Sequence, residues 1–245
     1  MGGRTTHPVT HSGACLPTRP LPSVGAMTGW TEAVLLRAAA LGPRVAVTEA
    51  AGGATLTYGT LAVRAPLAAQ GLRRRGLRPG DPVVVLLRGG CHLPVAGYAV
   101  LAAGGVVVSI PGGPAAAGAR IMITDRDDAD AIAQESNIRQ VYSFTGVPGT
   151  AGFDSLFGAD GPVAPTARLS TARLVAADDV ALVAGADLRA YDMVLGAGAR
   201  LVAAHEPDPA ECRRIIAGHG VTLLIDERLR VVPVRAHDRA LEANL

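Results

Sequence analysis

Short apolar runs alternate along the chain with segments of helical periodicity, and this alternation is the main structural signal of the sequence. Apolar runs of four to six residues, bounded by glycine, proline or charged residues, predict strands. These strands are expected at 44–48, 54–57, 82–87, 106–110, 121–124, 140–144, 180–184, 200–203 and 221–225. Because most of the runs are continuously apolar, they favour strands buried on both faces of a parallel sheet.

Between these runs, apolar residues recur at the intervals typical of helices. Helices are expected over 30–40, 57–75, 93–102, 127–135, 188–195 and 208–217. Thr57 is a suitable N-cap, and Asp208-Pro209-Ala210-Glu211 is a capping box with proline at the first helical position. Pro66 lies inside the second helix, where proline costs roughly 3 kcal/mol or kinks the helix. The pattern predicts an α/β fold, a mostly parallel sheet flanked by helices.

The chain divides into three regions by composition. Residues 1–26 are rich in proline, threonine and glycine, and we expect them to be disordered or an over-extended reading upstream of a natural start at Met27. Residues 27–225 carry the α/β pattern and form an incomplete domain. Residues 226–245 are expected to be a charged tail that adds no strand. The longest irregular stretch is 145–178.

One uncharged segment, residues 93–110, has the length of a membrane span. Gly104-Gly105 break it, and the composition changes from alanine-rich to β-branched at Val106-Val107-Val108. We therefore interpret it as a buried helix followed by a buried strand, with no membrane span.

Composition excludes several classes of function. The formal charge of +2, without a basic run with interleaved aromatics, argues against nucleic-acid binding. Cys15, Cys91 and Cys212 are odd in number and widely spaced, which fits a reducing cytoplasm better than disulfides. The histidines do not combine with them at metal-ligand spacing, and His7 and His11 lie in the segment expected to be disordered. We expect no metal site.

All 23 basic residues are arginine, so the sequence contains no lysine. A reaction step that needs an amine nucleophile, or a lysine charge on a phosphate, has no group in this chain to perform it. Arginine does not replace lysine like for like in such roles.

Residues 56–110 resemble the N-terminal part of the adenylate-forming superfamily, which includes acyl-CoA synthetases, peptide-synthetase adenylation domains and luciferases. The resemblance rests on Leu56-Thr57-Tyr58 opening a helix, Gly76-Leu77-Arg78-Pro79-Gly80-Asp81 before a strand, and Ala102-Ala103-Gly104-Gly105-Val106. Weaker similarities follow at 177–182, 198–202, 208–209 and 220–224. The resemblance implies a large α/β domain that joins a carboxylate to ATP.

The same resemblance implies a nucleotide loop directly after the strand at 180–184, rich in glycine, serine and threonine and ending in Pro-Lys-Gly. Here Ala184-Gly185-Ala186 runs directly into Asp187, so the loop is expected to be missing. A second deletion is expected at 111–118. The family's later acidic motifs and its C-terminal domain with a catalytic lysine find no match. We therefore expect catalytic incompleteness, with no catalytic residue to assign.

A glycine-rich stretch elsewhere, SFTGVPGTAG at 143–152, has the composition of a phosphate loop. Its candidates are Thr145, Gly146 and Gly149. It precedes the strand that the family's loop follows, and it has no lysine, so we interpret it as an ordinary connection. Cys91-His92, and Cys212 with His219, are conceivable nucleophile pairs, but neither has an identifiable third group to orient it.

Three functional hypotheses remain from the sequence. The chain is a non-catalytic α/β module that binds a partner such as a complete synthetase or carrier protein, or it is a degraded gene product. The third hypothesis is residual carboxylate–CoA ligase activity completed by a partner chain. No cofactor is expected. ATP and Mg²⁺ are expected to bind only if the family's activity survives.

Overall fold

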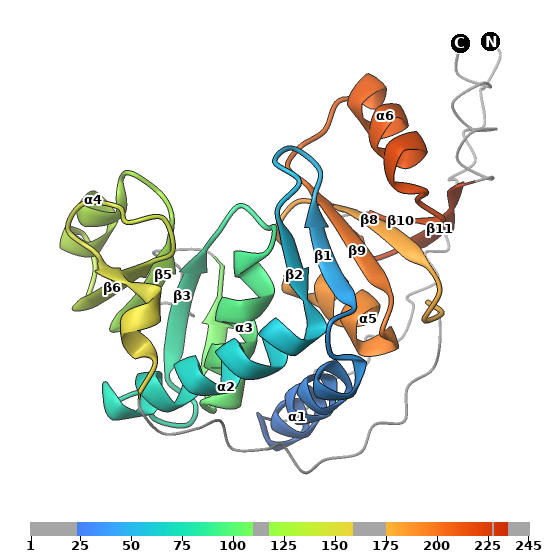
Figure 1. The fold of residues 1–245 in the computed structure, drawn as a ribbon. Helices are drawn as coiled ribbons and strands as arrows, with labels where there is room; N and C mark the ends of the chain where they lie inside the picture. Colours follow the sequence, from blue (N-terminus) through green and yellow to red (C-terminus); the bar gives the residue numbers. More distant parts are fainter. Residues whose placement is uncertain (1–23, 110–117, 159–174, 227, 235–245) are drawn as a thin grey trace, which may run out of the picture.

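The computed structural model describes residues 24–109, 118–158, 175–226 and 228–234 (Figure 1). The strands form two sheets, one of six strands in the order β11-β10-β8-β9-β1-β2 and one of five in the order β4-β3-β5-β6-β7. The expected mostly parallel α/β arrangement is confirmed, and it is divided between two sheets that stand side by side in Figure 1.

The six-stranded sheet has a parallel centre and antiparallel edges. Its parallel strands are β10 (Leu223–Ile225), β8 (Val180–Ala184), β9 (Arg200–Ala204) and β1 (Val45–Glu49). Its edge strands β2 (Thr55–Thr57) and β11 (Val231–Pro233) are antiparallel to β1 and β10. Ala181 of β8 lies opposite Leu201 of β9 and Leu223 of β10, so the register of the central strands is continuous.

The five-stranded sheet is parallel throughout. Its strands are β4 (Val106–Val108), β3 (Pro82–Leu86), β5 (Ile121–Thr124), β6 (Gln140–Ser143) and β7 (Ala151–Gly152). A 3-10 helix, η2 (Phe153–Leu156), follows β7.

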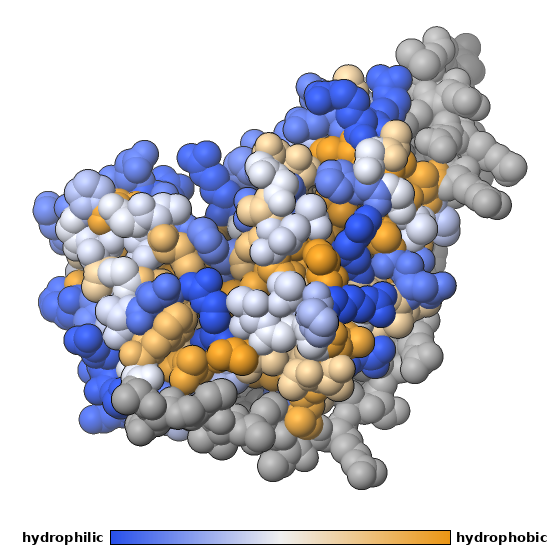
Figure 2. Space-filling view, viewed as in Figure 1, coloured by the Kyte–Doolittle hydropathy of each residue, from blue (hydrophilic) through white to orange (hydrophobic). Residues whose placement is uncertain are grey.

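Helices form three further layers. The central helices are α1 (Val24–Leu41), α2 (Tyr58–Arg74), α3 (His92–Ala102) and α5 (Leu188–Ala197). They share one core with the inward-facing residues of both sheets, such as Val83 and Val183. The neighbouring strand residues face other helices. Val84 of β3 packs with α4 (Ala129–Gln134), and Leu182 of β8 packs with α6 (Pro209–His219). Successive residues of β3 and β8 therefore face different layers, and so their apolar runs are continuous. Figure 2 shows hydrophilic residues over the outward side of α6.

The predicted helix starts are confirmed in detail. Thr57 Oγ1 accepts a hydrogen bond from Thr60 N (3.1 Å), and Asp208 Oδ1 accepts one from Glu211 N (2.7 Å). Helix α2 continues through Pro66, which is buried within it. Tyr58, the first residue of α2, donates a 2.6 Å hydrogen bond to the Ala199 carbonyl and so attaches the helix to the turn before β9.

The structure corrects some expectations. The expectation that no strand follows Ile225 is wrong, because β11 at Val231–Pro233 pairs with β10. The stretch after residue 145 contains β7 and η2 before residue 158. Residues 1–23, Cys15 among them, and positions 111–117 of the expected deletion site lie outside the described residues. The uncharged segment forms α3 and β4, and within the described part of the chain no helix meets the length and apolarity of a membrane span.

Candidate functional site

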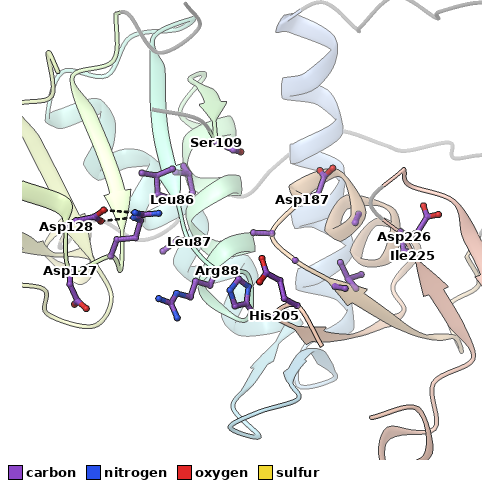
Figure 3. Close-up of a pocket in the computed structure, with 18 residues that line it drawn as sticks. Leu86, Leu87, Arg88, Ser109, Asp127, Asp128, Asp187, His205, Ile225 and Asp226 are labelled. Atoms are coloured by element: carbon purple, nitrogen blue, oxygen red, sulfur yellow. Dashed lines mark hydrogen bonds and ion pairs between the residues drawn. The ribbon is translucent and has the colours of Figure 1, made fainter. Parts of the chain in front are cut away.

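A cleft of about 890 Å³ lies where the carboxyl ends of strands from both sheets meet (Figure 3). Its lining comes from the ends of β3, β4 and β5 in one sheet and of β8, β9 and β10 in the other. The lining residues are Val85, Leu86, Leu87, Arg88, Ser109, Arg126, Asp127, Asp128, Val183, Ala184, Gly185, Ala186, Asp187, Ala190, His205, Glu206, Ile225 and Asp226. Open parallel sheets bind ligands outside the carboxyl ends of their strands, so this cleft is the candidate site.

The charged side chains approach the cleft from two sides. In Figure 3, Arg88, Asp127 and Asp128 come from the five-stranded sheet, and Asp187 and Asp226 from the other. With Glu206, the lining has five carboxylates against the two guanidiniums of Arg88 and Arg126, a formal charge of −3 with His205 neutral. The electrostatic field of the cleft therefore disfavours a polyphosphate.

Several of these carboxylates are held by neighbouring arginines. Arg126 donates two hydrogen bonds to Asp128 (2.7 and 2.6 Å), which lower the pKa of that carboxyl. Asp226 accepts a 2.9 Å hydrogen bond from Arg230 N and a 2.6 Å hydrogen bond from Arg230 Nε, and these contacts lower its pKa. Both groups stay ionised at neutral pH, so the cleft keeps its negative charge.

The connection from β8 to α5 is the part of the cleft most relevant to phosphate. It consists of residues 185–187, and Asp187 caps α5 by accepting a 2.9 Å hydrogen bond from Arg189 N. The Arg189 guanidinium also donates to both Asp187 oxygens (3.1 and 2.7 Å). Burial raises the pKa of Asp187, but the hydrogen bonds from Arg189 outweigh burial and lower it. A helix N-terminus that commonly holds an anion thus holds the chain's own carboxylate.

Two backbone segments meet at one end of the cleft. A Cβ atom on Gly89, whose φ is +102°, would lie 2.8 Å from the Gly185 carbonyl oxygen and 3.1 Å from Tyr191 Oη. Gly89 follows β3 and Gly185 follows β8, so one comes from each sheet. The contact requires glycine at position 89 both for space and for its positive φ.

Several backbone amides of the glycine-rich loop at 143–152 are occupied by side chains of the protein. Asp125 Oδ1 accepts hydrogen bonds from Phe144 N (2.8 Å) and Thr145 N (3.2 Å). Ser143 Oγ accepts one from Gly146 N (3.1 Å) and donates one to Asp125 Oδ1 (3.0 Å).

A phosphate at this loop would have to displace the Asp125 carboxylate. Gly149, with φ of +77°, lies against Asp130, since a Cβ there would be 2.4 Å from Asp130 Oδ1. The described lining of the cleft takes no residue from the loop, so Thr145, Gly146 and Gly149 do not face the candidate site.

Cys91 and His92 point to different partners. The Cys91 thiol is buried against the Ala54 carbonyl (3.7 Å), and burial, with Glu49 nearby, raises its pKa to about 12. His92 Nδ1 lies 3.1 Å from Asp125 Oδ2, and its ring stacks on Phe144 with centroids 4.2 Å apart. A thiol with so high a pKa is a poor nucleophile.

Cys212 is placed similarly. Its thiol contacts the Pro207 carbonyl (3.8 Å), and burial, then Asp208 and Glu211, raises its pKa. Over the ranges that the structure describes, no group of three or more His, Cys, Asp or Glu side chains is arranged to hold a metal ion.

Sequence reasoning missed the cleft residues. Arg88, Asp127, Asp187, His205 and Asp226 each follow a correctly predicted strand by a few residues. The signal available in the sequence was that a polar residue repeatedly follows the end of a predicted strand. The carboxyl ends of parallel strands lie at the same edge of a sheet, so such residues come together there. It could not reveal that two separate sheets would face the same cleft.

The fold is that of the N-terminal region of adenylate-forming enzymes. Similar solved structures include a protein described as a long-chain-fatty-acid CoA ligase from Rhodopseudomonas palustris (TM-score 0.65, 22% identity, 79% of this chain and 62% of that chain). Others are MbtA from Mycobacterium smegmatis (0.63, 22%, 84% and 51%) and a benzoate CoA ligase from Burkholderia xenovorans (0.63, 20%, 79% and 49%). The chain spans about half to three-fifths of the length of these proteins.

At the level of sequence, residues 35–147 match the family described as AMP-binding enzyme. The expected resemblance to the N-terminal region of adenylate-forming acyl-CoA ligases is therefore confirmed. No curated protein sequence matches the chain.

Proposed function

We propose that this chain is an adenylate-forming-type domain that does not activate a carboxylate by itself and acts as a non-catalytic binding module. The observation that carries the proposal is the Asp187 carboxylate on the N-terminus of α5, directly after β8. By resemblance, the family's phosphate loop follows this strand.

The electrostatics of the junction support the proposal. Adenylate formation requires groups that stabilise negative charge on phosphoryl oxygens. Here the Arg189 amide in the first turn of α5 is bonded to Asp187, and the Arg189 guanidinium is occupied by the same carboxylate. A nucleoside triphosphate at this position would meet the Asp187 carboxylate instead of free backbone amides.

The composition of the chain supports the same conclusion. None of its 245 residues is lysine, so neither a phosphate-loop lysine nor a catalytic lysine can come from it. The cleft's excess of carboxylates adds repulsion toward a polyphosphate. In this proposal the domain keeps the family's layers and loses its chemistry, acts in the cytoplasm, and takes a complete synthetase or carrier protein as its partner.

The deciding experiment is a thermal melt of the purified chain followed by circular dichroism, with and without ATP, Mg²⁺ and a non-hydrolysable acyl-adenylate mimic. We expect one cooperative transition, and we expect its midpoint temperature to stay the same when nucleotide is added. A midpoint that rises with nucleotide would show a working site and overturn the proposal. A transition without cooperativity would instead support a degraded gene product that does not fold alone.

A second candidate is ligase activity completed by another chain. It is favoured by the cleft of about 890 Å³, which lies where the carboxyl ends of strands from both sheets meet, the usual place of a ligand site in open parallel sheets. ATP–pyrophosphate exchange measured on the chain alone and in a mixture with a complete synthetase separates the two. Exchange above that of the synthetase alone supports completion, and unchanged exchange supports the non-catalytic module.

A further inference from the structure

A small pocket of about 120 Å³ lies at the edge of the five-stranded sheet opposite to the cleft. It is lined by the first residues of β3, β5 and β6, which are Pro82, Ile121 and Gln140. These strands run parallel, so their starts share one edge of the sheet, and the cleft lies at the other edge. Pockets for small organic ligands measure roughly 300–1,000 Å³, so this one has the size for a small ion.

Guanidinium groups dominate the charge of this pocket. Its lining contains Arg75, Arg120 and Arg139 against one carboxylate, that of Asp81, so the lining has a formal charge of +2. The Asp81 carboxylate is already bound, since it accepts hydrogen bonds from Arg120 Nη2 (3.0 Å) and from Arg78 N (3.0 Å). The positive charge in excess is therefore that of Arg75 and Arg139.

Arg75 differs from the two arginines that precede it at the end of α2. Arg73 Nε donates to the Ala103 carbonyl (3.3 Å), and Arg74 Nη2 donates to the Leu156 carbonyl (3.0 Å). Among the residues that the structure describes, the Arg75 side chain has no hydrogen bond or ion pair. Its guanidinium donors are therefore available to a ligand.

Arg120 and Arg139 are held by contacts that leave some of their donors unused. Arg120 Nη2 donates to the Asp81 carboxylate and to the Gly76 carbonyl (3.2 Å), and Arg139 Nη1 donates to the Ile138 carbonyl (3.1 Å). A guanidinium carries N–H groups on Nε and on both Nη atoms, so each arginine keeps donors that these contacts do not use. Side chains that are already held lose less entropy when they bind an anion.

The end of α2 gives a simpler reason for part of this charge, because cations are favourable at a helix C-terminus. Arg75 is the C-cap of α2, and its own carbonyl accepts a 3.1 Å hydrogen bond from Gln140 Nε2. The Gly76 carbonyl is bound by Arg120, so two carbonyls that would repel an anion are already paired. The helix end does not account for Arg139, which precedes β6 and binds no carbonyl of α2 in the described part of the chain.

We propose that this pocket binds a small tetrahedral dianion of the phosphate or sulfate type, with Arg75 and Arg139 donating to its oxygens and Arg120 adding charge. The planar fork of a guanidinium matches the spacing of two such oxygens. A dianion neutralises the charge of +2, whereas a carboxylate neutralises only half of it. The inference does not rest on the proposed function, because the pocket and the cleft lie at opposite edges of the sheet.

The test is isothermal titration calorimetry at pH 7.5 and constant ionic strength with inorganic phosphate, sulfate and acetate. We expect phosphate and sulfate to bind and acetate to bind about tenfold more weakly, because it has one charge. Arg139→Gln and Arg75→Gln should each weaken phosphate by about tenfold, since charge-assisted hydrogen bonds are lost. Arg214→Gln, at an exposed arginine of α6 outside the pocket, is the matched control and should leave the affinity within about twofold.

Glycerol 3-phosphate in the same titration distinguishes the source of the anion. Binding equal to that of inorganic phosphate supports a pocket that accepts a phosphate monoester, and much weaker binding supports a pocket for the free ion. Both results support the anion site itself.

A second readout locates the bound ion. Phenylglyoxal modifies accessible arginines, and mass spectrometry reports the rate at each position. At a phosphate concentration about ten times the Kd, modification of Arg75 and Arg139 should slow about tenfold, while Arg214 should react as before. No binding of phosphate or sulfate, equal affinity in Arg139→Gln and Arg214→Gln, or protection of all three arginines alike would each overturn the proposal. A melting midpoint that rises with ATP in Arg139→Gln as in the wild type would come from another site, so the nucleotide melt stays independent.

Discussion

The hydroxyl of Tyr191 accepts a 2.8 Å hydrogen bond from the backbone N–H of Gly90. Tyr191 lies on α5, which packs against the six-stranded sheet, whereas Gly90 lies in the connection that follows β3 of the other sheet. The next amide is held in the same way, since Cys91 N donates to Glu49 Oε1 at 2.8 Å. Two hydrogen bonds thus join the connection after β3 to elements of the opposite sheet.

Replacing Tyr191 with phenylalanine tests this link. The Gly90 N–H would lose its acceptor in a partly buried setting, so we expect the free energy of unfolding to fall by about 1–2 kcal/mol. Urea denaturation followed by circular dichroism measures it. Tyr142→Phe is the matched control, because its hydroxyl donates only to the partly exposed Gln140 side chain (2.9 Å). Equal losses in both variants would contradict a special role for Tyr191.

Among the glycines that the structure describes, Gly71 is the one at which a side chain would meet the most severe obstacle. A Cβ at Gly71 in α2 would lie 2.0 Å from the Leu156 carbonyl oxygen of η2, and a backbone atom cannot rotate away. We expect Gly71→Ala to cost about 1–3 kcal/mol of stability.

Gly218→Ala in α6 is the control for this change, since no atom lies within 4 Å of the point that its Cβ would occupy. That substitution should stabilise the protein by about 0.5 kcal/mol through helix propensity. Both values come from chemical denaturation curves. A Gly71→Ala variant as stable as the wild type would mean that α2 does not pack closely on η2.

The lowered pKa of Asp125 leads us to expect that the protein loses stability in acid. Burial alone would raise its pKa, but hydrogen bonds from His92, Phe144 N and Ser143 outweigh burial and lower the pKa to about 2. Because the folded pKa is below the unfolded one, the contribution is fully present above about pH 4 and is lost as pH falls through 2. It amounts to about 2 kcal/mol.

Urea unfolding of Asp125→Asn and the wild type at several pH values measures this contribution. The difference in stability between the two proteins should shrink from pH 5 to pH 2. A difference independent of pH would show that the carboxylate charge contributes nothing. Asp178→Asn, which removes an exposed carboxylate, is the control for this measurement.

For Asp192 we expect the opposite dependence of stability on pH. Its folded pKa, raised by burial to about 7, lies above the unfolded value, so the folded state holds the proton more tightly. The stability of the wild type relative to Asp192→Asn should therefore fall as pH rises from about 4 to 7. We expect the variant to gain on the order of 2 kcal/mol over this range, after allowance for partial exposure. A gain that appears only below pH 4 would refute the assignment.

The sequence was a good guide to individual elements. It predicts the strands Ile121–Thr124 and Val180–Ala184 with their observed bounds, because each is an apolar run between charged or small residues. The start of α6 followed from Asp208, whose side chain bonds to the third residue of the helix. Such signals are local, and local chemistry is fully present in the sequence.

The pairing of the strands was less accessible. Val83 and Val183 belong to different sheets, although their runs look alike, and only packing on the central helices assigns them. Strand β11 was missed because Val231–Pro233 is short and follows a turn in which Asp226 binds Arg230, a charged segment typical of a tail. The cleft residues were missed for the same reason, because their proximity depends on which sheet each strand joins.

The approach of Gly89 to the Gly185 carbonyl has a mechanical consequence. At that end of the cleft the space beside Gly89 is bounded by the Gly185 carbonyl and the Tyr191 hydroxyl, and position 89 has no side chain that could bend or rotate. The aperture there is consequently set by the backbone at positions 89 and 185 together with the Tyr191 hydroxyl. A bulkier residue at position 89 would act as a wedge between the layers and widen the entrance from a position that follows β3.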